Sequence, residues 1–197
     1  MQIEARPLGG RFIRLEPFTA ALKAPVRAAL DTDDEAWSIM VNNGGGAGFD
    51  DWWARRLAAT GAGAELAFAV RRLADGEVVG SSGYYTFRPE HRSVEIGSTF
   101  YRPDARSGPV NPEAKLLLLG HAFAAGAIRV EFVTDAINAR SRAALKRLGA
   151  VEEGVLRRHK ITWTGRVRDT VMFSITDQDW PAVRAKIQAR LEAYAQP

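Results

Sequence analysis

The segment Asn111–Ala150 contains the residues best suited to binding a phosphorylated ligand. A polar residue precedes each of its two predicted helices: Asn111 before Pro112, and Asn138 before Ser141. Free backbone N–H groups and the helix dipole attract anions at such helix starts. Because a single strand separates the helices, both starts should lie at the edge where open α/β sheets bind ligands. Two well-capped structural helices are the alternative interpretation.

The loop before the first helix adds positive charge. Arg102 and Arg106 precede Gly108 in this loop, and Asn111 is the expected N-cap of the helix that follows. Pro109 has no N–H group, so it removes one backbone donor that a phosphate could use. The loop therefore predicts an anion site that does not depend on the backbone alone.

The start of the second helix offers one more polar side chain than capping needs. Asn138 and Ser141 cannot both cap the same helix, so one of them remains available for another role. Leu145 and Leu148 are predicted to pack inward, and Gly149 suits a left-handed C-cap.

A glutamate within a predicted strand is a further candidate. In the segment Val94–Phe100, period-two alternation predicts that Glu95 and Thr99 share one face, whereas Ile96 and Phe100 share the other. A carboxylate is unusual in so apolar a strand, and the glycine two residues later permits a bulge or the close approach of a ligand. A solvent-facing glutamate on an edge strand explains the pattern equally well.

These candidates lie on an ordered set of strands and helices. Strands are predicted at residues 11–16, 65–73, 78–87, 93–101, 129–134, 151–159 and 166–174. Helices are predicted at residues 20–30, 49–59, 112–125, 141–148 and 178–194. Thr19 and Asp177 are the expected caps of the first and last helices, and Asp31–Gly48 is rich in turn residues. An antiparallel meander therefore leads into one right-handed βαβ crossover.

The composition limits the classes of function. The chain has 197 residues, a formal net charge of +4 and no cysteine. The lack of cysteine excludes disulfides, thiolate catalysis and cysteine-based zinc sites, and no His/Asp/Glu cluster has metal-ligand spacing. No apolar run is long enough for a membrane span, and no signal peptide is evident. We therefore expect a single cytoplasmic domain over residues 1–197, with no metal and no membrane contact.

The ordered set of motifs resembles the GCN5-related N-acetyltransferases (GNAT), and more closely their RimJ/RimL-like branch. The resemblance extends from Arg11 to Trp180. It rests on Glu95-Ile-Gly97, Asn111-Pro-Glu-Ala-Lys115, Asn138-x-x-Ser141, Leu148-Gly-Ala150, Glu153-Gly-Val-Leu-Arg157 and Arg168-Asp169. It implies an α/β fold with a mixed, mostly antiparallel sheet of about seven strands, helices on both faces, and a splayed parallel pair at the fourth and fifth strands.

The resemblance also implies a reaction, which is acetyl transfer from acetyl-CoA to a primary amine by direct attack in a ternary complex. Glu95 would accept the amine proton, directly or through water. Many family members carry a protonating tyrosine where this chain has Leu145, so Ser141 becomes the candidate that hydrogen-bonds the coenzyme sulfur. His91, His121 and His159 are alternative bases, and His121 fits a structural role better.

The residues that the resemblance assigns to acetyl-CoA are Gly97, Ser98, Thr99, Phe100, Arg102, Arg106, Gly108, Val110, Asn111, Asn138 and Ser141. Those expected to line the acceptor site are Trp37, Phe49, Trp53 and Trp163. Core packing explains each of these aromatic residues equally well. A protein N-terminus, a free amino acid, a polyamine and an aminoglycoside all remain open as acceptors.

Two other functions compete with the enzyme. A catalytically inactive protein of the same fold would bind acyl-CoA as a sensor or interaction partner. A nucleic-acid-binding module is suggested only by the basic charge, and its arginines are scattered rather than clustered on one segment. The C-terminal helix is a candidate homodimer interface.

Overall fold

The computed structural model describes residues 1–194, within which a single mixed sheet forms the centre of the fold. Its strands are β1 (Leu8–Gly9), β2 (Ile13–Pro17), β3 (Leu66–Arg72), β4 (Val78–Arg88), β5 (Ser93–Tyr101), β6 (Arg129–Asp135), β7 (Val151–Ile161) and β8 (Val167–Thr176). Their spatial order is β1-β2-β3-β4-β5-β6-β8-β7. The pair β5–β6 is parallel and the other neighbouring pairs are antiparallel. The mixed, mostly antiparallel fold is thus confirmed, and the short edge strand β1 adds an eighth strand.

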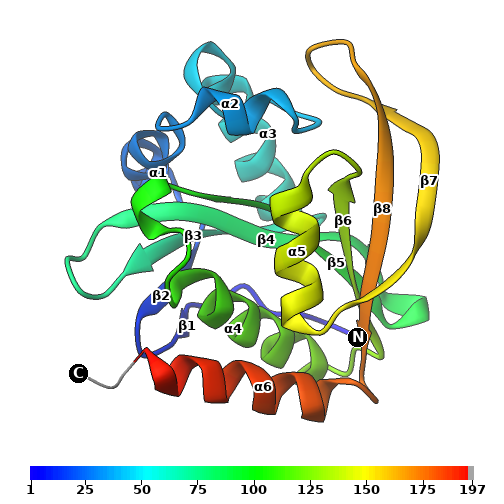
Figure 1. The fold of residues 1–197 in the computed structure, drawn as a ribbon. Coiled ribbons are helices and arrows are strands. Elements are labelled where there is room, and N and C mark those ends of the chain that lie inside the picture. Colours follow the sequence, from blue (N-terminus) through cyan, green and yellow to red (C-terminus); the bar gives the residue numbers. More distant parts are fainter. Residues whose placement is uncertain (195–197) are drawn as a thin grey trace.

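Helices cover both faces of this sheet (Figure 1). They are α1 (Lys23–Leu30), α2 (Asp34–Ser38), α3 (Phe49–Gly61), α4 (Val110–Ala124), α5 (Ala139–Leu148) and α6 (Trp180–Ala193). Short 3-10 turns lie at Ala20–Leu22, Gly46–Gly48, Pro89–His91 and Pro103–Ala105. Buried side chains form one core cluster with α1, α2 and α3, and a larger one with α4, α5 and α6.

Three predicted helix caps are wrong. The helix α4 already begins at Val110, so Asn111 lies within its first turn and Pro109 occupies the N-cap position. Thr19 precedes only a 3-10 turn and makes no capping bond through its side chain. The last helix begins at Trp180, because the Asp179 carboxylate holds the preceding turn by accepting bonds from the backbone N–H and hydroxyl of Thr176. The segment Asp31–Gly48, predicted to be rich in turns, also contains α2, which Asp33 caps by accepting from the Ala36 N–H.

A bulge interrupts β5 next to the place where the strands part. Gly83 lies opposite Gly97 and Ser81 opposite Phe100, so two residues of β5 face one residue of β4. Ser98, in the bulge, has a φ of 47°, in the left-handed region. The extra residue inverts the alternation. Phe100 therefore stacks on Trp37 at a centroid distance of 4.7 Å, on the opposite side of the sheet from Ile96, and the predicted shared face is wrong.

The parallel pair is short. Ser93–Glu95 pairs with Arg129–Glu131, after which β5 and β6 separate. The two strands continue to Tyr101 and Asp135, so a gap opens between them beyond Glu95.

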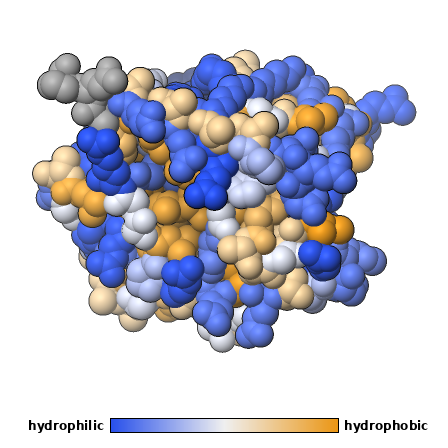
Figure 2. Space-filling model, turned by 90° about the horizontal axis from the view of Figure 1, so that it is seen from below, coloured by the Kyte–Doolittle hydropathy of each residue, from blue (hydrophilic) through white to orange (hydrophobic). Residues whose placement is uncertain are grey.

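The surface shows no extended apolar band on the face seen from below, where hydrophilic and apolar residues are mixed (Figure 2). Within residues 1–194, no helix has the length and apolar character that a membrane crossing requires.

Candidate active site

A cavity of about 830 Å³ opens where β5 and β6 part. Its walls come from both faces of the sheet and from the β7–β8 hairpin. Of the residues predicted for the site, it is lined by Trp37, Glu95, Gly97, Ser98, Thr99, Phe100, Arg106, Gly108, Asn111, Asn138 and Ser141. The structure does not bring Arg102, Val110, Phe49, Trp53 or Trp163 to this lining. The cavity therefore joins the predicted catalytic pair with most of the predicted coenzyme residues.

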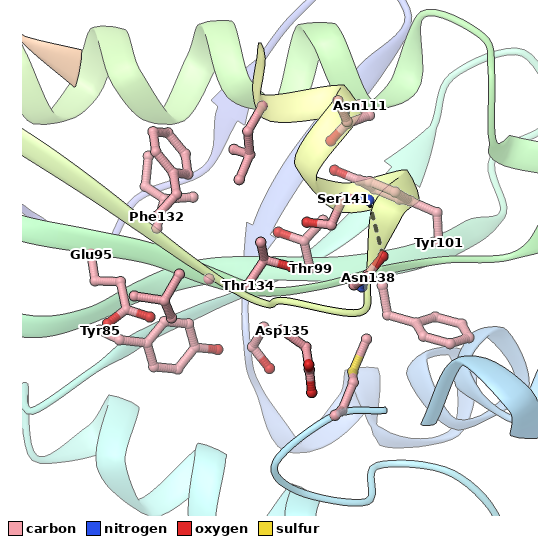
Figure 3. Close-up of a pocket in the computed structure, with 18 of the residues that line it drawn as sticks. Tyr85, Glu95, Thr99, Tyr101, Asn111, Phe132, Thr134, Asp135, Asn138 and Ser141 are labelled. Carbon is pink, nitrogen blue, oxygen red and sulfur yellow. Dashed lines mark hydrogen bonds between the residues drawn. The ribbon is translucent and has the colours of Figure 1, made fainter. Parts of the chain in front are cut away.

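Glu95 lies on the last pair of β5 with β6, at the point of separation. Its Oε2 accepts a hydrogen bond of 3.2 Å from the Thr86 hydroxyl. Burial raises the pKa of Glu95 above the usual range of a carboxyl group, and the positive charge of Lys160 limits that rise. A carboxylate with a raised pKa is a better proton acceptor near neutral pH. The carboxylate points into the cavity, beside Tyr85 (Figure 3).

The start of α5 resolves which residue caps it. Asn138 is the N-cap, and its Oδ1 accepts a 2.9 Å bond from the backbone N–H of Ser141. The Ser141 hydroxyl has no hydrogen-bond partner among residues 1–194, so it is the polar group available to a ligand. At the other end of the helix, Gly149 has a φ of 102°, which confirms the predicted left-handed C-cap.

The bulge in β5 exposes backbone to the cavity between these two side chains. Ser98 and Thr99 lie opposite a single residue of β4, so their peptide groups are displaced from the regular ladder. Arg56 donates a 3.1 Å bond to the Ser98 hydroxyl and holds the bulge from the side of α3.

The N-terminus of α4 faces one end of the cavity. Ser107, Gly108 and Asn111 contribute to the lining there. Pro109 and Pro112 have no N–H, so the first turn offers the backbone donors of Val110 and Asn111 only. Four arginines from the loop before α4, from α5 and from α6 also line the cavity and add positive charge: Arg106, Arg140, Arg147 and Arg190. The last three were not predicted, because each lies on an exposed helix surface where arginine is common.

Arg106 already has partners within the protein. Its guanidinium donates to Asp33 at 2.6 Å and to the carbonyl of Tyr101 at 2.8 Å. This ion pair links the loop before α4 to the N-cap of α2.

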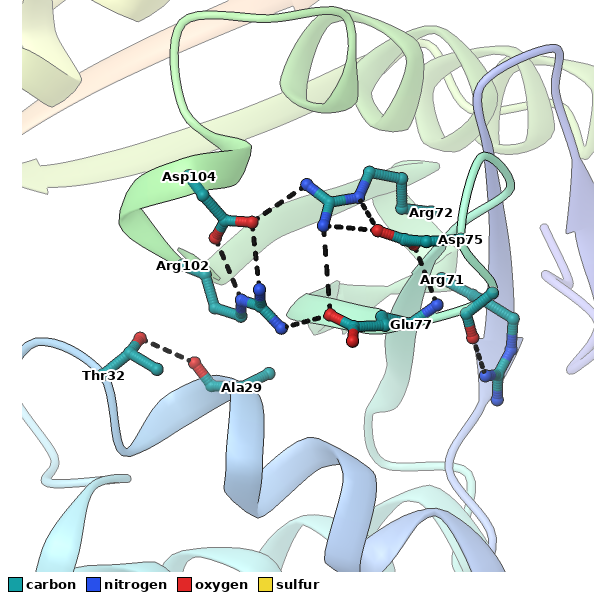
Figure 4. A network of polar contacts seen from close by, with 9 residues as sticks. Ala29, Thr32, Arg71, Arg72, Asp75, Glu77, Arg102 and Asp104 are labelled. Carbon is teal, nitrogen blue, oxygen red and sulfur yellow. Dashed lines mark hydrogen bonds and ion pairs between the residues drawn. The ribbon is translucent and has the colours of Figure 1, made fainter.

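Arg102 forms ion pairs at the protein surface and does not line the cavity. It donates to Asp104 at 2.9 Å and to Glu77 at 2.7 Å, and Arg72 bonds the same Asp104 from the β3–β4 hairpin (Figure 4). This network fixes the loop that precedes α4. Val110 is buried in the core beneath that loop.

The aromatic residues divide between core and cavity. Trp37, Phe49, Trp52 and Trp53 all belong to the buried cluster beneath α1, and of these four Trp37 and Trp52 also line the cavity. Trp163 is half exposed at the tip of the β7–β8 hairpin, where its Nε1 donates to the carbonyl of Trp37 at 2.8 Å. Its backbone N–H also donates to the carbonyl of Val41 at 3.0 Å. The hairpin tip therefore docks on the α2 segment and closes that side of the cavity without Trp163 lining it.

Further polar residues that were assigned no role from the sequence line the cavity, among them Tyr85, Lys115, Asp135, Lys160 and Arg168. Helical spacing could have identified Lys115, because it shares the buried face of α4 with Leu118 and Leu119. Arg168 belonged to a motif already noted. Of the histidines, His121 is buried on α4 with its Nδ1 3.4 Å from the Tyr84 hydroxyl, away from the cavity lining.

Comparisons with known proteins agree with this geometry. A family model described as an acetyltransferase (GNAT) domain matches residues 13–151. A GCN5-related N-acetyltransferase from Brucella melitensis is 31% identical, with a TM-score of 0.87 over 95% of this chain and 86% of that one. No curated protein matches the chain.

Two more distant structures share the fold. RimJ from Mycobacterium smegmatis, in complex with CoA-disulfide, is 24% identical with a TM-score of 0.76, over 94% of this chain and 93% of that one. A ribosomal-protein-S5-alanine acetyltransferase from Vibrio fischeri is 15% identical with a TM-score of 0.73, over 89% and 98%. The family model and the Brucella relative together show that this chain belongs to the GNAT acetyltransferases, a family that uses acetyl-CoA.

Proposed function

We propose that this protein transfers an acetyl group from acetyl-CoA to a primary amine, by direct attack within a ternary complex. The observation that carries the proposal is the placement of Glu95 and Ser141 in one cavity, with the bulged backbone of β5 between them. In Figure 3, Glu95 lies towards one end and Asn111, Asn138 and Ser141 towards the other. A base for the amine and a hydrogen-bond donor for the leaving sulfur thus belong to the same space.

Glu95 would take the proton that the amine loses as it attacks. An α-amino group has a pKa of about 8, so part of it is neutral at working pH and needs only modest help. The burial that raises the pKa of Glu95 brings base and amine closer in proton affinity. Transfer could pass directly or through a water molecule.

The bulge and Ser141 would act on the thioester. A backbone N–H group from the Gly97–Phe100 segment, freed from the ladder, would polarise the carbonyl oxygen. The hydroxyl of Ser141, which has no partner among the described residues, would hydrogen-bond the sulfur and pass a proton from solvent water to the departing thiolate. Leu145 lines the cavity nearby and has no proton to give.

The cavity fits acetyl-CoA as the donor. The start of α4 and the surrounding arginines suit its phosphates, and the gap between β5 and β6 suits the pantetheine arm. Asn138 uses its Oδ1 for capping, so its Nδ2 group is what remains for the arm. We further propose that the enzyme belongs to the RimJ/RimL-like branch, for which a protein N-terminus is one acceptor to test.

Replacing the two catalytic candidates tests the roles. Glu95→Gln should lower kcat/KM by about 100-fold with an identified acceptor, since general bases typically contribute that much or more. Ser141→Ala should lower kcat by about tenfold while acetyl-CoA binding, measured by calorimetry, stays within about threefold of wild type. Release of free thiol during an amine screen gives the rates, and Glu90→Gln on the exposed Pro89–His91 turn is the control.

Wild-type turnover in both variants would show that the role assignment is wrong. Tight acetyl-CoA binding with no transfer to any amine would instead favour the inactive sensor.

A further inference from the structure

Arg168 is a buried arginine whose charge is only partly matched. It lies on β8 with 6% of its surface exposed, and it lines the cavity. Its Nε donates to the Thr170 hydroxyl at 3.1 Å. The two terminal nitrogens of its guanidinium have no hydrogen-bond partner among residues 1–194. Neither nitrogen is among the fully buried polar atoms that lack a partner, so both remain accessible from the cavity to a ligand.

The carboxylate that forms an ion pair with Arg168 is shared. Asp135 lies 3.9 Å from the Nε of Arg168, but its Oδ2 also forms a direct ion pair with Arg166. The other oxygen, Oδ1, accepts a bond from the backbone N–H of Ile137 at 3.2 Å. Asp135 therefore serves two arginines and a peptide group with a single negative charge.

A second cation lines the same part of the cavity. Lys160, half-buried on β7, forms no ion pair with any carboxylate of residues 1–194. Lys160 lies opposite Arg168 in the pairing of β7 with β8, and both line the same cavity as Glu95. Their positive charges act to lower the pKa of Glu95. The neighbouring carboxylates already have partners: Glu131 pairs with Arg88 at 2.9 Å and with Arg129 at 2.8 Å, and Glu65 pairs with Arg56 at 2.5 Å. Glu95 and the shared Asp135 therefore face three cations, Arg166, Arg168 and Lys160.

We infer that the acceptor is an amine that carries a carboxylate a few bonds from its nitrogen, bound by the terminal nitrogens of Arg168 with support from Lys160. This inference rests on the proposed function, because it places the amine at Glu95. The planar guanidinium group of an arginine can donate two parallel hydrogen bonds to the two oxygens of a carboxylate, as it also can to a phosphate. Because Arg168, Lys160 and Glu95 line one cavity, the site favours a compact unit, either a free amino acid or an acidic N-terminal residue of a peptide.

Binding to the CoA-loaded protein tests the inference apart from turnover. The first pair of probes is phenylalanine and phenethylamine, which differ by the carboxylate alone. The second pair is the dipeptide amides Asp-Ala and Asn-Ala, in which the side chain supplies the one carboxylate. In at least one pair, calorimetry should show the carboxylate member binding about tenfold or more tightly, as expected for a charge-assisted bidentate contact. The pair that shows the preference tells a free amino acid from an acidic N-terminus.

Substitutions of Arg168 and Lys160 test whether these two cations cause the preference for the carboxylate member of each pair. Arg168→Met should abolish it and Arg168→Lys should restore part of it, with CoA binding unchanged. Lys160→Met should reduce the carboxylate preference several-fold. This variant should fold, since Lys160 is only half-buried and has no ion pair within the described chain, so it tests the inference even if Arg168→Met does not fold. Arg157→Met, on the exposed surface of the same hairpin, should keep the full preference.

The outcomes separate the inference from the proposed function. Equal affinity for both members of each pair, binding of neither, or an undiminished preference in Arg168→Met and Lys160→Met would overturn the inference. A carboxylate preference in binding with no acetyl transfer to any amine would overturn the proposed function and leave the inference standing. Acetyl transfer with equal kcat/KM for phenylalanine and phenethylamine, and for the two dipeptide amides, would overturn the inference and leave the proposed function standing. A role limited to tuning Glu95 would shift the pH profile without changing the preference.

Discussion

Lys115 is a buried lysine that no carboxylate among residues 1–194 pairs with. Its Nζ donates to the Thr99 hydroxyl at 2.8 Å and to that of Ser82 at 3.3 Å, beneath the bulge in β5. Burial lowers the pKa of Lys115 to about 7. The ammonium group is hydrogen-bonded but its charge is not matched, so the folded protein favours the neutral amine.

This environment predicts that Lys115 weakens the fold near neutral pH. In the unfolded chain its pKa returns to about 10.4, so between about pH 7 and 10.4 the unfolded state holds a proton that the folded state lacks. Stability from this group therefore rises with pH across that window, by up to about 1.4 kcal/mol per unit. Lys115→Met should raise the free energy of unfolding at pH 7 and flatten its rise towards pH 10.

Urea unfolding of both proteins at pH 7, 8, 9 and 10 measures the difference. A variant that is less stable than wild type at pH 7, with an unchanged slope against pH, would mean that Lys115 is held as a charged group instead. Lys186→Met, exposed on α6, is the matched control.

Residue-level patterns led to the cavity where one side chain had few alternatives. Glu95 stood out because an apolar strand seldom carries a carboxylate, and it lines the cavity. The excess of caps at Asn138 and Ser141 indicated a free side chain, which is that of Ser141. The aromatic residues were ambiguous for a physical reason. Tryptophan at helical spacing suits a core and a cavity wall equally: Trp52 and Trp53 both pack in the core cluster, but only Trp52 of the two also lines the cavity.

At the scale of elements, Glu113 fastens the edge of the sheet to α4. Its carboxylate accepts three backbone bonds of 2.7 Å, from the N–H groups of Arg11, Phe12 and Ile13. Gly10 makes room for this contact, since a Cβ there would lie 2.3 Å from the carboxyl carbon of Glu113. The first turn of α4, which faces the proposed phosphate site, is thereby tied to the β1–β2 turn.

Removing this tie should destabilise the protein strongly. Glu113→Ala leaves three N–H groups of the turn without their acceptor, and we expect a loss of about 3 kcal/mol in the free energy of unfolding. Glu113→Gln should cost less, because its amide oxygen can still accept. Urea unfolding near pH 7 measures both, and Glu90→Ala on the exposed Pro89–His91 turn is the control. A loss below about 0.5 kcal/mol for Glu113→Ala would contradict this account.

The order of the strands and helices could be predicted from local sequence patterns, but the contacts and irregularities that join them could not. Alternation and turn residues were enough to place β3 to β8 in sequence order. They could not place the bulge at Ser98, whose left-handed backbone is imposed by its neighbours rather than by its residue type. Nor could they show the docking of Trp163 on the α2 segment, a contact between residues far apart in the chain. The two-residue strand β1 carries too short a pattern to be recognised.

Across the whole molecule, cations from separate elements converge on one end of the cavity. Arg106 comes from the loop before α4, Arg140 and Arg147 from α5, and Arg190 from α6. The net charge of +4 is modest, so their placement matters more than their number. Such a cluster should attract the phosphates of CoA through a field that salt can screen.

The helix α6 offers a matched pair for the last prediction. Arg190 and Arg184 are both exposed on it, but only Arg190 lines the cavity. Arg190→Gln should weaken CoA binding about threefold at low ionic strength, as expected for an exposed charge pair, whereas Arg184→Gln should change it little. Calorimetry at about 50 mM salt measures both. Near 0.5 M salt the difference between the variants should shrink, because the screening length falls to a few ångströms. Equal weakening by both substitutions would mean that CoA responds to the overall charge of the protein, and that the arginines at the mouth of the cavity form no local phosphate site.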